Sequence, residues 1–161
     1  MGVVKNHRKL EIMQVFIIGT ALETAKALDA KRLNKQTIEA RQILKAIVGD
    51  SKAWANHPCT LMYREHWEWL YSYERALEHH KRGNPTLAKA WSEDAARKTP
   101  PFHTEAYFKQ MKRRLFTKNP EHYSQWAHLG TSNENWYFVD GEWRYYCNGK
   151  RIPESEIIPM F

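Results

Sequence analysis

Glycine and proline breakers constrain the fold of this chain more than any other feature. Gly49, Gly83 and the pair Pro100-Pro101 divide the chain up to residue 118 into segments of helical character. Glycine commonly ends a helix and proline cannot continue one, so each breaker marks a helix boundary. The sequence therefore predicts a mainly α fold, a compact helical bundle of several helices of moderate length.

The first two helices have recognisable ends. "TALE" (20–23) has the Thr-x-x-Glu form of a capping box, which predicts a helix start at Thr20. The preceding "VFIIGTAL" (15–22) is expected to be a strand or a buried turn. Asp29 is expected to cap a second helix that runs to about Val48. The core face of that helix should carry Leu33, Ala40, Leu44 and Ile47.

Three further helices are expected after a loop. Proline disfavours helix in the residue before it, so "WANHPCT" (54–60) should be that loop. A long helix from about Thr60 to Arg82 should follow, a shorter one should open at Asn84-Pro85, and a last one should cover 102–118. The aromatic residues of the long helix should lie mostly in the core or in a second layer around it; these are Tyr63, Trp67, Tyr71 and Tyr73.

The last thirty residues change period. "NWYFVDGEWRYYCNGKRI" (135–152) places the turn dipeptides Asp140-Gly141 and Asn148-Gly149 between alternating aromatic runs. This pattern predicts a small C-terminal β-meander. The expected organisation is a basic N-terminal extension (1–12), a helical domain (13–130) and the aromatic meander (131–161) packed on the same domain.

Charge limits the partners of the chain. The 161 residues carry a net charge of +7, which favours nucleic acid, then an anionic membrane, over a basic domain without such a partner. No run approaches the ~20 apolar residues that span a bilayer, and residues 1–12 hold no apolar signal segment. Cys59 and Cys147 lack metal-ligand spacing, and the neighbours His79 and His80 diverge on a helix, so no metal is expected. A reduced, cytoplasmic protein is expected.

One helix face mixes a single acid with cations. Lys31, Lys35, Glu39 and Gln42 follow one another at spacings of four, four and three, so they share the face opposite the core. One interpretation is a solvated face, where the Lys35–Glu39 pair contributes about 0.3–0.5 kcal/mol. The other is a site that uses one acid among several cations.

Several segments together resemble the phage endonuclease V family, the pyrimidine dimer DNA glycosylases, and their bacterial relatives. They are "MQVFI" (13–17), "LDAKRLNKQTIEARQIL" (28–44), "NHP" (56–58), "MYREHWEWL" with "HHKRG" (62–83) and "FHTEAYFKQMKRRLFTKNPEHY" (102–123). The resemblance lies in their order and rough spacing between residues 13 and 126. The meander lies outside it.

The resemblance implies a compact helical enzyme that binds damaged duplex DNA as a monomer and uses no cofactor. In the family a primary amine attacks C1′ of the sugar to form a Schiff base, a carboxylate assists departure of the base, and β-elimination breaks the strand. Glu39 aligns with the catalytic glutamate of the family. Beside it, Ile38 stands where the family has an arginine.

The resemblance does not fix the attacking amine. In the phage enzyme a threonine after the initiator methionine supplies it, whereas Gln14 follows Met13 here. The candidates are the α-amine of Gly2 if translation starts at Met1, the α-amine of Met13 if it starts there, and the side chain of Lys35. A fourth alternative is that Glu39 activates water and no amine acts.

A second set of residues is expected to bind DNA. His57 has an equally open alternative as a hydrogen-bonded structural residue, and a dense run of cations near 112–118 is typical of phosphate contacts. A competing hypothesis is a non-enzymatic nucleic-acid-binding accessory protein on the same scaffold. The expected DNA-binding residues are Lys31, Arg32, Gln36, Gln42, His57, His103, Lys112, Arg113, Arg114, Lys118, His122 and Tyr123.

Overall fold

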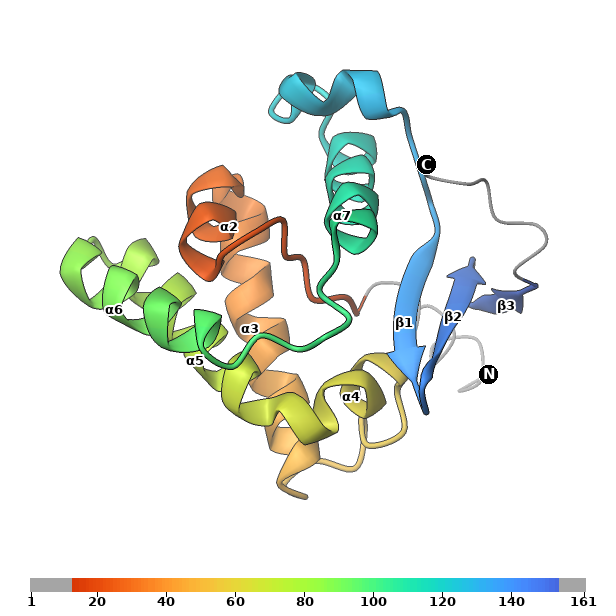
Figure 1. Cartoon of the computed structure of the whole chain (residues 1–161), viewed down its shortest axis with the longest axis horizontal. Coiled ribbons are helices and arrows are strands. Elements are labelled where there is room, and N and C mark those ends of the chain that lie inside the picture. The colour runs from red at the N-terminus through yellow and green to blue at the C-terminus, as the bar shows by residue number, and fades with distance from the viewer. Residues whose placement is uncertain (1–12, 154–161) are drawn as a thin grey trace.

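Helices make up most of residues 13–153, the part of the chain that the computed structural model describes (Figure 1). A small antiparallel sheet lies at one side of them, and two 3₁₀ turns cover Arg64–His66 and Ser124–Leu129. The expected mainly α fold with a C-terminal β-meander is confirmed. The N-terminal extension lies outside the described residues. The helices are α2 (Ala21–Ala27), α3 (Ala30–Ile47), α4 (Pro58–Tyr63), α5 (Trp67–Lys81), α6 (Pro85–Ala96) and α7 (Glu105–Lys118).

The predicted ends of α2 and α3 are largely confirmed. Thr20 and Glu23 form the capping box: the Glu23 amide donates to the Thr20 hydroxyl at 3.1 Å, and the Thr20 amide donates to the Glu23 carboxylate at 2.9 Å. Gly49 follows α3 with φ +89°, the left-handed region that glycine adopts freely. Asp29 occupies the N-cap position of α3 but its side chain makes no cap bond. Its carboxylate accepts a hydrogen bond from the Tyr123 hydroxyl instead.

The prediction of a single helix from Thr60 to Arg82 is wrong. The chain instead forms α4, which begins at Pro58, then a 3₁₀ turn and then α5. On one regular helix Tyr63 and Trp69 would diverge by roughly 120°. The interruption lets their buried rings stack with centroids 5.4 Å apart. Tyr63 and Tyr73 are buried, whereas Trp67 and Tyr71, expected in the core or a second layer, are exposed.

The segment 13–18 is extended and buried but belongs to no sheet. Figure 1 shows it running between α2 and α3 on one side and α7 on the other. Side chains from α5 and α7 bond its main chain in place of a strand partner. The Tyr107 hydroxyl of α7 donates to the Val15 carbonyl at 3.3 Å, and the Tyr73 hydroxyl of α5 donates to the Phe16 carbonyl. The prediction of a strand or a buried turn missed this arrangement.

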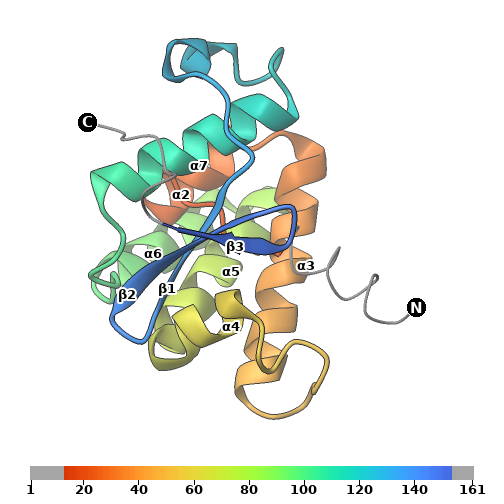
Figure 2. The ribbon, with the colours of Figure 1, turned by 90° about the vertical axis from the view of Figure 1, so that its right-hand side faces the viewer.

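The sheet consists of β1 (Asn135–Val139), β2 (Glu142–Cys147) and β3 (Lys150–Ile152), paired antiparallel in that order (Figure 2). Both predicted turns are present, with φ near +53° at Asp140 and Asn148 before their glycines. β1 is packed on both faces. The Tyr137 hydroxyl donates to the Met13 carbonyl at 2.7 Å, whereas Phe138 on the other face contacts Phe102. The sheet therefore shares the core of the helices.

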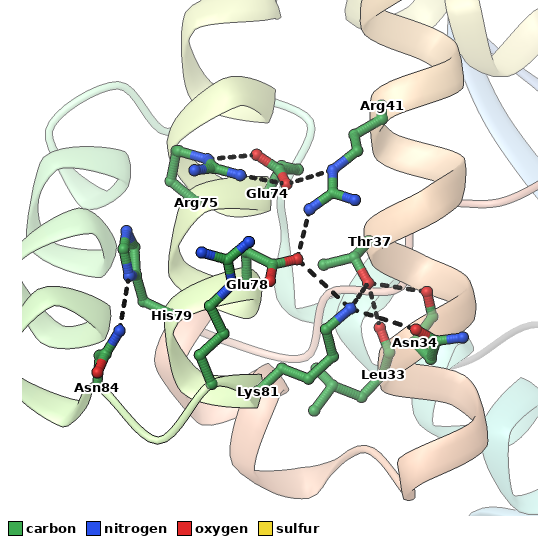
Figure 3. A network of polar contacts seen from close by, with 11 residues as sticks. Leu33, Asn34, Thr37, Arg41, Glu74, Arg75, Glu78, His79, Lys81 and Asn84 are labelled. Atoms are coloured by element: carbon green, nitrogen blue, oxygen red, sulfur yellow. Dashed lines mark hydrogen bonds and ion pairs between the residues drawn. The ribbon is translucent and has the colours of Figure 1, made fainter.

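An ionic network fixes α3 against α5 (Figure 3). The Arg41 guanidinium donates to the Glu74 carboxylate at 2.8 Å and also to Glu78, and both carboxylates are buried. The Lys81 ammonium lies 3.4 Å from the Glu78 carboxylate. These pairs hold one side of α3, while the segment 13–18 covers another. None of the helices within residues 13–153 has the length and apolar character to cross a bilayer.

Candidate active site

A small, shallow recess, open to solvent, lies where α3, α7 and the segment 13–18 meet. Two elements supply its polar side chains. α3 contributes four side chains at helical spacing, and the last residue of α7 contributes a lysine from the opposite side. The lining residues are Phe16, Arg32, Lys35, Gln36, Glu39 and Lys118.

Glu39 is the acid of this recess, and it is only 7% exposed. The segment 13–18 crosses α3 and covers it, so the expected polar face is not the solvated face of a free helix. The Gln14 main-chain N–H donates to Glu39 Oε2 at 3.2 Å, and Lys35 Nζ lies 4.0 Å from Oε1. Burial raises the pKa of Glu39 to about 7, although the Gln14 N–H and the nearby cations oppose the shift. Near neutral pH this carboxyl exists in both protonation states.

Gln36 holds the covering segment in place. Its side-chain oxygen accepts from the Phe16 N–H at 2.9 Å and lies 2.8 Å from the Tyr73 hydroxyl oxygen, and its amide donates to the Gln14 carbonyl at 2.7 Å. Gln36 is 3% exposed, and these bonds occupy its oxygen and one of its amide protons. Its place in the structure is that of a clamp on the segment rather than a DNA contact.

Three cations, Arg32, Lys35 and Lys118, lie near the acid, and Arg114 lies near Lys118. Lys118 is half-buried, and burial together with the nearby guanidinium groups of Arg114 and Arg32 and the ammonium of Lys35 lowers its pKa to about 8. Arg114, one turn before Lys118 on α7, is 6% exposed, and burial lowers its pKa. Its Nε has no hydrogen-bond partner in residues 13–153. Such a cluster is strongly electropositive and fits a phosphate.

Of the three histidines expected near DNA, His57 is buried and His103 is half-buried, and both have partners within the protein. His57 caps α4: its Nδ1 accepts from the Cys59 N–H at 3.0 Å. His103 lies among aromatic rings, and its Nε2 is 2.8 Å from the Tyr63 hydroxyl. Burial lowers the pKa of His103 to about 3, so the ring is neutral and carries no charge for a phosphate.

The remaining expected DNA contacts are not gathered at the recess. Tyr123 is fully buried and bonded to Asp29, and the exposed His122 has its Nε2 3.1 Å from the Ala27 carbonyl. On α7, the Arg113 guanidinium donates to the Thr131 carbonyl at 2.6 Å and the Lys112 ammonium lies 5.9 Å from the Trp126 ring centroid. Lys31 is exposed and Gln42 half-buried on α3, and neither lines the recess.

Two residues of the site could not be found from the sequence pattern. Gln14 supplies its main-chain N–H to Glu39, and Phe16 lines the recess. A main-chain donor leaves no signature in residue type. Within the part of the chain that the structure describes, no cluster of three or more His, Cys, Asp or Glu side chains is placed to hold a metal.

The family assignment agrees with this arrangement. Residues 13–91 match the family model described as pyrimidine dimer DNA glycosylase. Over these residues, just under half of the chain, the sequence is similar to that family. The matched stretch of the pyrimidine dimer DNA glycosylase family includes the covering segment and α3 with Glu39, Lys35 and Arg32, whereas α7 lies beyond it. The match supports a DNA glycosylase function and a DNA substrate. No curated protein and no solved structure matches the chain.

Proposed function

We propose that this chain is a monomeric DNA glycosylase that removes a damaged or modified pyrimidine from duplex DNA, with Glu39 as the acid and a primary amine as the nucleophile. The observation that carries the proposal is a buried carboxyl group that shares an open recess with three cations. An ordinary surface ion pair has no reason to be covered by another segment of the chain.

The protonation state of Glu39 suits departure of a base. A pyrimidine leaves C1′ with the electrons of the N-glycosidic bond and needs a proton, and an acid works best when its pKa lies near the working pH. The pKa of Glu39, about 7, meets that condition. Once ionised, the same carboxylate stabilises positive charge at C1′.

The cations suit the DNA backbone. Arg32, Lys35, Arg114 and Lys118 lie close enough to oppose one another's charge, which costs free energy in the unbound protein. A phosphate removes that cost, so binding of a polyanion is favoured here beyond the general effect of the net charge. A nucleotide turned out of the stack would bring its sugar towards Glu39 while its phosphates meet these cations.

An amine at C1′ adds strand cleavage to base removal. The imine it forms acidifies the C2′ proton, a carboxylate removes that proton, and the 3′ phosphate leaves. Among the expected amines, Gly2 lies outside the described residues, Met13 is 1% exposed, and Lys35 Nζ is 4.0 Å from Glu39. The nitrogen nearest to Glu39 on the covering segment, that of Gln14, is a peptide nitrogen and not an amine.

The test is turnover on a duplex that carries one thymine dimer, with an undamaged duplex beside it. Glu39→Gln should lower base release by about 100-fold or more, because general acid catalysis is lost, while DNA affinity stays within about 2-fold. Glu93→Gln, the same change at an exposed position of α6, should behave as wild type. Full turnover by Glu39→Gln would remove Glu39 from the mechanism. Tight binding by wild type without base release would favour the accessory-protein alternative.

A further inference from the structure

Lys118 meets Glu39 across the recess although the two residues are 79 positions apart in the chain. It is the last residue of α7, and it lines the recess from the side opposite α3. Its ammonium is close enough to the Glu39 carboxylate for each charge to act on the other. An amine and an acid therefore face the same small volume.

The surroundings of Lys118 favour its unprotonated form. Burial disfavours the ammonium, and Arg114 on the same helix with Arg32 and Lys35 on α3 adds repulsion, while Glu39 opposes these effects. With a pKa of about 8, roughly one molecule in ten carries the free amine at pH 7. An amine has to be in that form to act as a nucleophile.

Lys35, the other lysine of the recess, has a different setting. Its side chain is 39% exposed, and it forms the ion pair with Glu39 from one turn earlier on the same helix. An exposed cation at the rim is suited to hold a phosphate. Lys118 is the more enclosed of the two.

We propose that Lys118 is the amine that attacks C1′ of the damaged nucleotide and forms the Schiff base. The inference rests on the proposed glycosylase function and names the nucleophile of that same site. It differs from attack by a chain-terminal amine, since it places the nucleophile on α7, beyond the residues that match the family.

The step balances with Glu39 as the only other participant. The lone pair of the Lys118 amine forms the bond to C1′, the electrons of the N-glycosidic bond leave with the base, and the base takes the proton of Glu39. The Glu39 carboxylate then removes one proton from the new C1′–N nitrogen. It returns that proton to O4′ as the sugar ring opens, which leaves a protonated imine between Lys118 and C1′ and an ionised Glu39.

Borohydride trapping with peptide mapping tests the assignment. The full chain is incubated with a duplex carrying one thymine dimer and, separately, with a duplex carrying one abasic site, and the reduced adduct is digested and sequenced by mass spectrometry. The expected result is a single adduct on Lys118. Lys118→Arg keeps the positive charge without a comparable nucleophile, so it should bind DNA within about 3-fold of wild type. Its adduct should fall by about 100-fold.

Lys89→Arg, an exposed position on α6, is the matched control and should form the wild-type adduct. An adduct on any other amine, or a wild-type adduct yield from Lys118→Arg, overturns the assignment and leaves the glycosylase function standing. Base release without any adduct overturns the assignment of Lys118 and indicates that water is the nucleophile. Neither release nor adduct with either duplex overturns both proposals. The mapping uses the wild-type chain, so the identity of the modified amine does not depend on how the variant folds.

Discussion

Burial of Glu39 decides both its chemistry and its effect on the stability of the fold. In the unfolded chain the carboxyl has its ordinary pKa near 4.5, whereas in the folded protein burial raises the pKa to about 7. Folding therefore favours the protonated form. The stability that this provides is fully present below about pH 4.5 and is lost as the pH rises through 7.

Glu39→Gln should for this reason be more stable than wild type in alkaline solution. The free energy of unfolding of the two proteins should be similar near pH 4 and should differ by roughly 1–3 kcal/mol near pH 8, because the variant has no charge to bury. Denaturant unfolding at both pH values measures this. Glu93→Gln, on the exposed side of α6, provides the comparison. A pH-independent difference for Glu39→Gln would mean that the carboxyl is not buried as described.

At the residue scale, the sequence predicted which residues lie at the recess better than it predicted how buried they are. The resemblance selected Glu39, and charge selected Arg32, Lys35 and Lys118, which do lie together. Their burial could not be predicted, because the segment that covers α3 lies about twenty residues earlier in the chain. The two alternatives for His57 were likewise inseparable until the Cys59 N–H was seen to be its partner.

At the scale of elements, Gln36 is the link between α3 and the segment 13–18. Gln36→Ala should destabilise the protein by roughly 2–4 kcal/mol, because it leaves the Phe16 N–H and the Gln14 carbonyl buried without partners. Denaturant unfolding gives the value.

Gln42→Ala on the same helix is the control for that variant. Gln42 is half-buried and does not line the recess, so the loss should stay within about 0.5 kcal/mol. An equal loss of stability in the two variants would show that the hydrogen bonds of Gln36 to the segment 13–18 do not stabilise the fold.

The elements themselves were predictable where local chemistry sets them. The Thr20–Glu23 capping box, the glycines after helices and the two turn dipeptides act within a few residues, and each of those predictions is confirmed. The break between α4 and α5, across which the rings of Tyr63 and Trp69 stack, has no glycine or proline to mark it in the sequence. The buried course of the segment 13–18 depends on side chains from three helices.

At the scale of the whole molecule, we expect the positive charge at the recess to contribute more to DNA binding than positive charge elsewhere on the surface. Arg32→Gln should weaken binding to a duplex and reduce the slope of log affinity against log salt by about 0.9, because one fewer phosphate is neutralised. Titrations at several salt concentrations measure the slope.

Lys89→Gln removes the same charge from the exposed face of α6, and it should leave the salt slope unchanged. Equal effects of the two variants would indicate that net charge, rather than the recess, attracts DNA.

The packing of the aromatic sheet on the helical domain was expected from the sequence. Its two-sided contacts, which join Met13 to Tyr137 and Phe102 to Phe138, depend on the tertiary fold.

The bond from the Gln14 main chain to Glu39 has a consequence for how such a protein varies during evolution. A side-chain partner would be lost by many substitutions, whereas a peptide N–H survives every replacement except proline. Selection on the partner of the acid therefore acts on the path of the backbone. The Gln14 side chain is constrained separately, because it is fully buried and donates to the Trp136 carbonyl at 3.4 Å.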